Sequence, residues 1–388
     1  MTTRKLRVSF TGYYGMDNFG DDLFGAICSA ATRVYWRGEP RLAGPAIVGV
    51  DTRYTMPRWY PASVYGAGGT LGKASRLYSF TRAIHGADVL VMGGGSVITA
   101  RESFRKPMML SAHRRGKVQL AAVGVSIGPF DDPASEASVA DFIQRFAYLS
   151  VRDRRSYDLA MNMGLRGKVH HGRDLAGLLP LLLPLSRPGS GAMPGAATIR
   201  IGIALCNYSE AQSYAAPNKR RLQSSMVAAL AKLAGERPLR IDIFSLNEHD
   251  QHGDRVLARA LREQLNQHGV AAQVLSYRGL GPIATAQEIG RCDAFISARL
   301  HGAIVAYLQG VPFTIIDYHP KCNDFADDIG LPSSQRITAQ RQDAEAFDGA
   351  LAAMLGDEHA PTLSRELYAL QAQDIFKSSP WSMVPEAT

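Results

Sequence analysis

Short apolar runs alternate with amphipathic stretches along the chain, and this alternation predicts an α/β protein with mostly parallel sheets. In the first half, the apolar runs predict strands at residues 6–10, 46–50, 88–92, 119–125, 147–151 and 168–171. In the second half, they predict strands at 199–205, 239–245, 270–276, 293–297 and 312–317. Helical periodicity separates the later strands, and a last helical stretch is expected at about 340–371.

A segment rich in glycine, proline and small residues, SRPGSGAMPGAAT at 186–198, separates the two series and predicts a linker. A chain of 388 residues also suits two domains better than one. We therefore expect Rossmann-like domains over 1–185 and 199–335 that face a cleft, with 336–388 as a helical segment packing back on the first domain. This outline is GT-B-like, and a single extended sheet is the alternative.

Composition indicates a soluble globular protein, with 46% hydrophobic and 20% charged residues. The longest apolar stretch, at 175–185, contains two prolines and is too short to span a bilayer. The basic N-terminus is followed by a glycine- and aspartate-rich loop where a signal peptide would have an apolar region. We predict a cytoplasmic protein.

The cysteines and histidines give no sign of a metal site. Four cysteines are far apart and form no CxxC pair, so they predict buried free thiols rather than a zinc module or disulfide framework. The stretch NEHDQHGD at 247–254 collects two histidines and three acids without ordered ligand spacing, and we interpret it as a solvated loop. We expect no metal and no cofactor.

The net charge of +8 suits anionic partners such as phosphorylated substrates, acidic glycans or an anionic membrane face. Nucleic acid is not expected, because the basic clusters are short and lack interleaved aromatic residues. A basic face would hold the protein peripherally at the inner membrane face, whereas scattered charges would serve solubility alone. The candidates for such a face are Arg33, Arg37, Arg101, Arg105, Lys106, Arg114, Arg115 and Lys117.

The stretch SARLHGAIV places Arg299, Leu300 and His301 where a predicted strand ends and a helix begins. A helix N-terminus favours anions, and the planar fork of Arg299 suits a carboxylate or a phosphate. His301 can carry a proton near neutral pH. The alternative is that Arg299 pairs with a structural acid and His301 caps the helix.

A second strand end carries Arg152 in the stretch SVRDRRS. Asp153 or Ser156 could cap the helix that follows, and we expect Arg154 and Arg155 to be solvated. Arg152 directly follows apolar residues and is expected to point into the cleft. Together with Arg299 it would hold a small anion between the domains.

The loop TGYYGMDNFGDD follows the first predicted strand. Glycines in such a loop allow backbone to approach a ligand or another segment closely. Asp21 and Asp22 could take part in chemistry, and Asp21 could instead cap the next helix.

These segments together resemble the polysaccharide pyruvyl transferase family. The stretches GYYGMDNFGDD, VMGGGS, GVSIGPF, SVRDRRS, SARLHGAIVAYLQGVPF and DYHPKCNDFADDIGL follow the order of that family over about residues 8–331. The chain departs from the family at His319, Ser96 and Asp22, where an acidic residue, a glycine and a glutamate are common. These positions lie on loops expected to face an acceptor sugar.

The resemblance implies a GT-B-like fold and transfer of pyruvate from phosphoenolpyruvate to a sugar as a ketal. It also implies that Arg299, Leu300 and His301 form a donor-binding motif and that Arg152 is the other donor-contacting arginine. The remaining assignments are Lys321, Gly94 and Gly95 for the donor and Tyr13, Tyr14, Asn18 and Asp21 for the acceptor. Lys321 could equally be an exposed loop lysine.

Ketal formation fits these residues chemically. Phosphoenolpyruvate carries a carboxylate and a phosphate on neighbouring atoms, which match two arginines and a helix N-terminus. We assign His301 as the general acid that protonates the methylene carbon, with Asp21 or Asp22 as the base for the sugar hydroxyl. The acceptor is expected to be a sugar of a cell-surface glycan or exopolysaccharide, carried on a lipid.

Two other functions fit the same architecture. A glycosyltransferase using a nucleotide-sugar would need an acid for the ribose hydroxyls, for which Asp317 or Asp324 are candidates. A non-catalytic glycan-binding protein would not need Arg152, Arg299 and His301.

Overall fold

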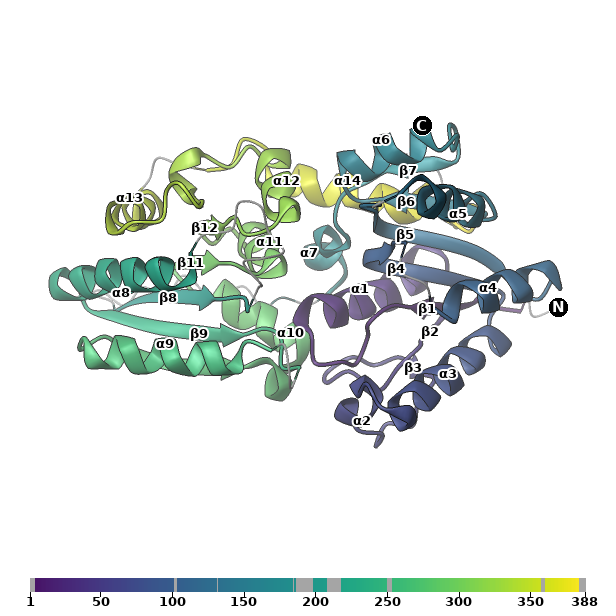
Figure 1. Ribbon diagram of the computed structural model, residues 1–388, viewed down its shortest axis with the longest axis horizontal. Helices are drawn as coiled ribbons and strands as arrows, with labels where there is room; N and C mark the ends of the chain where they lie inside the picture. The colour runs from purple at the N-terminus through teal and green to yellow at the C-terminus, as the bar shows by residue number, and fades with distance from the viewer. Residues whose placement is uncertain are drawn as a thin grey trace. The chain divides into compact units, whose positions relative to one another are not determined.

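The computed structural model in Figure 1 describes residues 4–100, 103–130, 132–183, 185, 198–207, 218–249, 253–356 and 360–383. The chain divides into unit 1, Met1–Leu183 with Tyr368–Thr388, and unit 2, Pro184–Leu367. The predicted linker lies outside the described residues except for Thr198. Residues 336–367, which we predicted to accompany the first domain, belong to unit 2.

In its described part, unit 1 is built on a seven-stranded sheet whose paired strands are parallel, in the order β3-β2-β1-β4-β5-β6-β7. The strands are β1 (Arg7–Thr11), β2 (Glu39–Leu42), β3 (Arg53–Tyr54), β4 (Val89–Ile98), β5 (Gln119–Ile127), β6 (Tyr148–Val151) and β7 (Val169–His171). Its helices are α1 (Phe19–Tyr35), α2 (Ala62–Gly66), α3 (Thr70–His85), α4 (Arg105–Arg114), α5 (Pro133–Ile143), α6 (Arg154–Asn162), α7 (Leu179–Leu182) and most of α14 (Arg365–Lys377).

The prediction of a strand at 46–50 is wrong, because these residues form no strand. Gly49 has a φ of 73°, and this left-handed conformation breaks an extended backbone. The chain instead forms β2 and β3 on either side of this stretch, in sequences too polar to be recognised as strands. Their charges compensate each other, since Arg53 of β3 donates to Glu39 of β2 at 2.9 Å.

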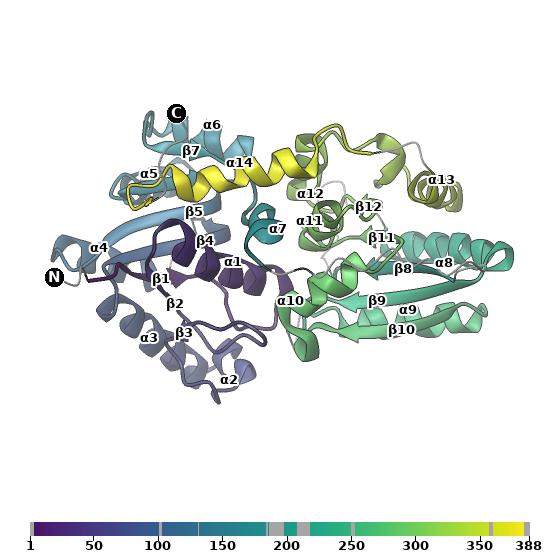
Figure 2. The same cartoon turned by 180° about the vertical axis from the view of Figure 1, so that it is seen from behind.

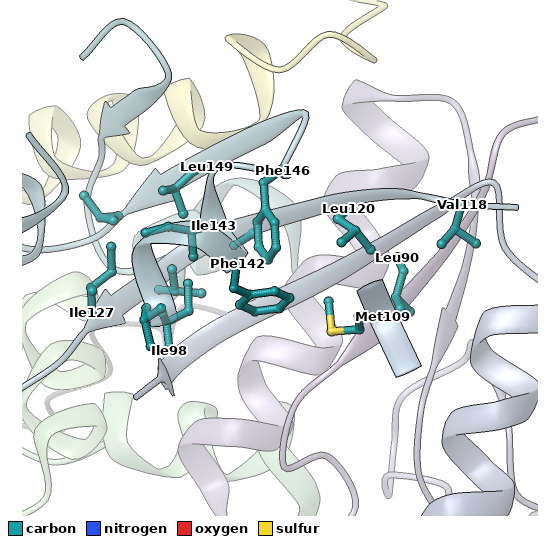
Figure 3. Packing of buried hydrophobic residues seen from close by; sticks show 14 of the residues in the cluster. Leu90, Ile98, Met109, Val118, Leu120, Ile127, Phe142, Ile143, Phe146 and Leu149 are labelled. Atoms are coloured by element: carbon teal, nitrogen blue, oxygen red, sulfur yellow. The ribbon is translucent and has the colours of Figure 1, made fainter. Parts of the chain in front are cut away.

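The hydrophobic core of unit 1 lies against the central strands (Figure 3). Leu90, Leu120 and Leu149 come from three adjacent strands and are at most 2% exposed. Phe142 and Phe146 pack edge to face beside them, with ring centroids 4.9 Å apart. Burial of each such side chain contributes about 1.5–3 kcal/mol, so the centre of the sheet is a firm base for the residues at its strand ends.

The C-terminal residues pack on unit 1, where Figure 2 shows α14 running beside the strands. The indole of Trp36 donates to the carbonyl of Phe376 at 3.0 Å, and the Tyr148 hydroxyl donates to that of Ile375 at 2.8 Å. Trp36 also contacts the Phe376 ring, with centroids 4.9 Å apart. Residues 368–383 therefore pack as part of unit 1.

The described part of unit 2 contains a six-stranded sheet whose paired strands are parallel, in the order β10-β9-β8-β11-β12-β13. Its strands are β8 (Ile199–Ala204), β9 (Leu239–Ser245), β10 (Ala271–Ser276), β11 (Ala294–Ser297), β12 (Phe313–Ile316) and β13 (Arg336–Ile337). Its helices are α8 (Lys219–Glu236), α9 (Arg255–Gln267), α10 (Tyr277–Gly290), α11 (Leu300–Gln309), α12 (Pro320–Asp328) and α13 (Ala344–Leu355).

The two sheets are separate, which rules out the single extended sheet. The stretch predicted as one helix at 340–371 contains α13 and the start of α14, and Pro361 lies between them. In the described ranges, we find no helix with the length and apolar character that crossing a bilayer requires.

A buried carboxylate ties three strands of unit 2 together. Asp242 of β9 is fully buried and accepts hydrogen bonds from Arg200 of β8, from Arg240 at 3.1 Å and from Gln273 of β10 at 2.7 Å. Burial alone would raise the pKa of Asp242, but these donors and the charge of Arg200 lower it. The carboxylate therefore stays ionised at neutral pH.

Replacing this carboxylate should destabilise unit 2. We expect Asp242→Ala to cost about 3 kcal/mol of unfolding free energy, because it removes the buried carboxylate that accepts from Arg200, Arg240 and Gln273 and leaves Arg200 with Glu288 as its remaining acidic partner. Urea unfolding at pH 7 measures this, with Asp348→Ala in an exposed pair with Lys232 as the control, expected to cost less than about 1 kcal/mol.

The pH dependence of unfolding provides a second test. Because the folded pKa of Asp242 is depressed, its contribution is present above the unfolded value of 3.8 and is lost as the pH falls below it. Equal urea-unfolding midpoints for Asp242→Ala and Asp348→Ala would contradict the role of Asp242 as a buried, ionised carboxylate that stabilises unit 2.

Candidate active site

The carboxyl ends of four neighbouring strands of unit 2 meet at one edge of its sheet. Because β9, β8, β11 and β12 are parallel neighbours, the residues after them lie along the same edge. These residues include Cys206 after β8, Asn247 after β9, Arg299 after β11 and Tyr318 after β12.

Arg299 is held at this edge by a buried carboxylate. Its Nε donates to Oδ2 of Asp254 at 2.9 Å, and its Nη2 donates to Oδ1 at 2.5 Å. The side chain of Asp254 is 1% exposed, whereas that of Arg299 is 19% exposed. Asp254 also accepts from the backbone N–H groups of Asn207 at 3.3 Å and Asn247 at 3.1 Å. The predicted alternative that Arg299 pairs with a structural acid is confirmed.

This pairing still leaves part of Arg299 for a ligand. Asp254 takes one edge of the guanidinium fork, through Nε and Nη2, while Nη1 makes no hydrogen bond to the described residues. Burial lowers the pKa of Arg299, but the charge and hydrogen bonds of Asp254, together with smaller contributions from Cys206 and Tyr318, raise it, and the net direction is upward. Arg299 is therefore a fixed, permanently charged group with a second hydrogen-bonding edge.

Helix α11 begins directly after Arg299 and adds backbone donors. Arg299 is the N-cap residue, but its side chain makes no capping hydrogen bond. The first turn packs closely on β11, since a Cβ at Gly302 would lie 2.6 Å from the Ser297 hydroxyl. Leu300 is 6% exposed, so only its backbone is suited to a ligand, whereas His301 is half-buried. The alternative that His301 caps this helix is wrong, because it lies inside the first turn.

Lys321 and Tyr318 continue the same edge after β12. The ammonium of Lys321 lies 5.9 Å from the centroid of the Tyr318 ring. Burial raises the pKa of Tyr318, and the positive charge of Arg299 opposes this effect. His319 caps α12 by accepting from the backbone N–H of Lys321 at 3.3 Å. The structure thus brings Arg299 and Lys321 near one tyrosine, and Lys321 is half-buried rather than a fully exposed loop lysine.

In unit 1, Arg152 lies in a buried polar cluster at the ends of β4, β5 and β6. It donates through Nη1 to Asp174 at 2.8 Å and through Nε to the Ser126 hydroxyl at 2.8 Å. A longer contact of 3.4 Å joins Nη2 to the hydroxyl of Ser96. The side chains of Arg152 and Asp174 are 7% and 6% exposed. The guanidinium of Arg152 is therefore buried within unit 1, where Asp174 pairs with its charge.

Asp153 has the capping role predicted for it. Its carboxylate accepts from the backbone N–H of Ser156 at 2.8 Å at the start of α6, and from the Ser126 hydroxyl at 2.6 Å. Arg154 is solvated as expected, with a side chain 70% exposed. Whether Arg152 contacts a donor stays a prediction.

The glycines assigned to the donor let α1 approach β4. Gly94 and Gly95 have φ of 76° and 81°, and a Cβ at Gly94 would lie 2.5 Å from the Phe24 ring. A Cβ at Gly95 would have Asp21 Oδ1 as its nearest neighbour at 3.7 Å. The half-buried carboxylate of Asp21 is therefore next to these glycines of β4.

The N-terminal loop separates its residues into inner and outer positions. Tyr14 is 1% exposed and its hydroxyl donates to the carbonyl of Gly93 at 2.6 Å, which places it in the core rather than on an acceptor surface. Asp22 is 3% exposed and accepts from the backbone N–H of Gly15 at 2.6 Å, so it braces the loop. The cap of α1 is Asn18, and the prediction that Asp21 caps it is wrong. Tyr13, 45% exposed, remains available to a ligand.

Sequence reasoning missed the two aspartates that hold the arginines. Asp254 belongs to the stretch that we interpreted as a solvated loop, and this interpretation is wrong at Asp254 and at Glu248, which is 2% exposed. His252 of that stretch lies outside the described residues. In the described ranges no group of three or more potential ligand side chains has metal-binding geometry. The useful signal for Asp254 was its position just before a helix and after β9.

Two Rossmann-like units of this topology define a GT-B-like protein, and solved structures of the same fold agree. UDP-GlcNAc 2-epimerase from Methanocaldococcus jannaschii matches with a TM-score of 0.58 and 10% identity over 97% of this chain and 99% of that one. The MnaA–UDP structure from S. aureus matches with 0.56 and 10% over 95% and 91%. At these identities the likeness shows the fold alone.

The sequence narrows this class to one family. The profile of the polysaccharide pyruvyl transferase family matches residues 18–320, which is most of the chain. The protein belongs to this family, and the predicted family resemblance and GT-B-like fold are confirmed.

Proposed function

We propose that this protein transfers the pyruvyl group of phosphoenolpyruvate to two hydroxyls of a glycan sugar, forming a pyruvate ketal and releasing phosphate. The observation that carries the proposal is the arrangement around Arg299 in unit 2. One edge of its guanidinium is fixed by Asp254, and its backbone begins a helix that no N-cap side chain caps. Membership of the family supports the transferase class.

The donor suits this arrangement because its two anionic groups sit on neighbouring carbons. The second edge of Arg299 can receive a carboxylate or a phosphate through two N–H groups. The first backbone N–H groups of α11 are suited to the other anion. Lys321 adds a positive charge on the same strand-end edge. We assign Arg299, Lys321 and the backbone at Leu300 and His301 to donor binding.

The reaction needs one proton delivered to carbon and two removed from oxygen. His301 gives a proton to the methylene carbon, which becomes a methyl group and leaves an electron-poor carbon bearing phosphate and carboxylate. One sugar hydroxyl adds to this carbon, and a second hydroxyl then displaces phosphate. Of the two aspartates considered as the base, Asp21 is half-buried and Asp22 braces its own loop, so we assign Asp21.

Phosphate release tests the proposal directly. The protein is incubated with phosphoenolpyruvate and a panel of free, diphosphate-linked and lipid-linked oligosaccharides, and the products are analysed by mass spectrometry. We expect phosphate release that depends on one acceptor, with a product that has gained one pyruvate minus water. Release that leaves the glycan mass unchanged would contradict ketal formation.

Thermal unfolding separates this proposal from a nucleotide-sugar transferase. A ligand that binds only the folded state raises the melting temperature by mass action. We expect phosphoenolpyruvate to stabilise the protein and UDP-sugars to have no effect. The opposite pattern would favour the glycosyltransferase.

A further inference from the structure

A cavity in unit 1 lies where the end of β4 meets helices α3, α4 and α5. Its volume is about 330 Å³, within the range of small-ligand pockets. Tyr13 lines it from the loop after β1, Arg76 from α3, and Arg105 and Lys106 from the start of α4. Ser96 of β4, Thr99 and Ser103 add hydroxyl groups to the lining, and Nη2 of the buried Arg152 lies 3.4 Å from the Ser96 hydroxyl.

The described side chains that line this cavity carry charges of one sign. It is lined by three cationic side chains and, among the described residues, by no aspartate or glutamate. Arg76 donates to the backbone carbonyls of Tyr65 and Ala67, the latter at 2.9 Å. Lys106 donates to the carbonyl and hydroxyl of Ser138 at 2.8 and 2.6 Å. These neutral acceptors position the cations without neutralising them.

Arg105 has the most hydrogen-bonding capacity left. The one hydrogen bond that its side chain makes to the described part of the chain is a long contact of 3.4 Å to the carbonyl of Gly12. Its guanidinium lies 5.5 Å from the centroid of the exposed Tyr13 ring. Burial raises the pKa of the nearby Tyr65, whereas the charges of Arg105 and Arg76 both lower it. The two guanidiniums therefore affect the same hydroxyl.

We propose that this cavity binds an anionic group of the acceptor glycan, either a hexuronate carboxylate or a phosphate of its carrier. Three cations that no acid among the described lining residues neutralises, beside an exposed aromatic ring, fit an acidic sugar better than a neutral one. Arg105 and Lys106, which were candidates for a membrane-binding face, thus line a binding cavity. The inference rests on the proposed function for the identity of the ligand as acceptor.

Direct binding without donor tests the inference. Calorimetry compares a neutral disaccharide, a hexuronate-containing disaccharide and a sugar diphosphate. We expect one of the two anionic probes to bind at least about tenfold more tightly than the neutral one, as a charge-assisted hydrogen bond allows. Arg105→Gln should remove this preference and Arg105→Lys should retain most of it. The control Arg114→Gln removes the same charge from an exposed position at the end of α4 and should have no effect.

Three outcomes would overturn the inference. The neutral and anionic sugars could bind equally, or Arg105→Gln and Arg114→Gln could weaken binding equally, which would indicate only the net charge of the protein. In a parallel sedimentation assay, Arg105→Gln could lose binding to anionic vesicles while keeping the sugar preference, which would assign the cations to a membrane. Arg105-dependent sugar binding without phosphate release in any assay would support the anion site and refute the proposed reaction instead.

Discussion

His301→Ala is expected to lower turnover by about a hundred- to ten-thousand-fold while the protein stays folded. Proton delivery to carbon by a positioned side chain contributes an acceleration of this size. His301 follows Arg299, which we propose binds the donor, by two residues and lies in the first turn of α11, where Leu300 and Gly302 are buried. The measurement is kcat for phosphate release at saturating phosphoenolpyruvate, with circular dichroism to verify the fold.

Two further variants separate proton transfer from positioning. His301→Gln keeps a hydrogen-bonding side chain of similar reach but cannot donate a proton as an acid, so it should be as slow as His301→Ala. His268→Gln changes an exposed histidine of the same unit and should be as active as the unaltered protein. Near-normal turnover of His301→Gln would mean that His301 only positions the donor.

Asp254→Ala should abolish stabilisation by phosphoenolpyruvate and weaken the fold of unit 2. The carboxylate orients Arg299 through two hydrogen bonds and joins the ends of β8 and β9 through two backbone N–H groups. Removing one member of a buried ion pair typically costs about 3–5 kcal/mol, because the remaining charge loses its partner. Denaturant unfolding and the melting temperature with and without phosphoenolpyruvate measure the two effects.

Asp254→Asn separates donor binding from folding. Asparagine keeps the size and one acceptor oxygen but cannot accept both hydrogen bonds from the fork of Arg299. We expect KM for phosphoenolpyruvate to rise by about tenfold or more, as the loss of one charge-assisted hydrogen bond implies. Asp348→Asn in an exposed pair is the matched control. An unchanged KM in a folded Asp254→Asn variant would show that Arg299 is not held for the donor.

The hydrophobic pattern of the sequence predicted most of the strands and helices, because strands buried on both faces of a sheet consist of continuous apolar runs. The observed β9 has the predicted bounds of 239–245, and the predicted strand at 119–125 is the first part of β5. The polar β2 and β3 were missed because their charges are compensated by each other and not by their own neighbours in sequence.

The candidate site could be predicted as far as it is local. Arg299, Leu300 and His301 follow a strand and open a helix, and this order alone places them at the carboxyl edge of a parallel sheet. Lys321 follows the next strand and is placed by the same reasoning. The capping role of Asp153 was also local, since its partner lies three residues away.

The sequence by itself therefore determined which residues reach the strand ends, while the tertiary structure decided what each one does there. Arg299 and Asp254 are 45 residues apart in the sequence. They come into contact because β9, which precedes Asp254, and β11, which precedes Arg299, both pair with β8 in the sheet. Asp174 likewise reaches Arg152 from 22 residues away. Periodicity reports which backbone segments are buried, but the charge state and exposure of a side chain depend on partners that only the folded sheet brings within hydrogen-bonding distance.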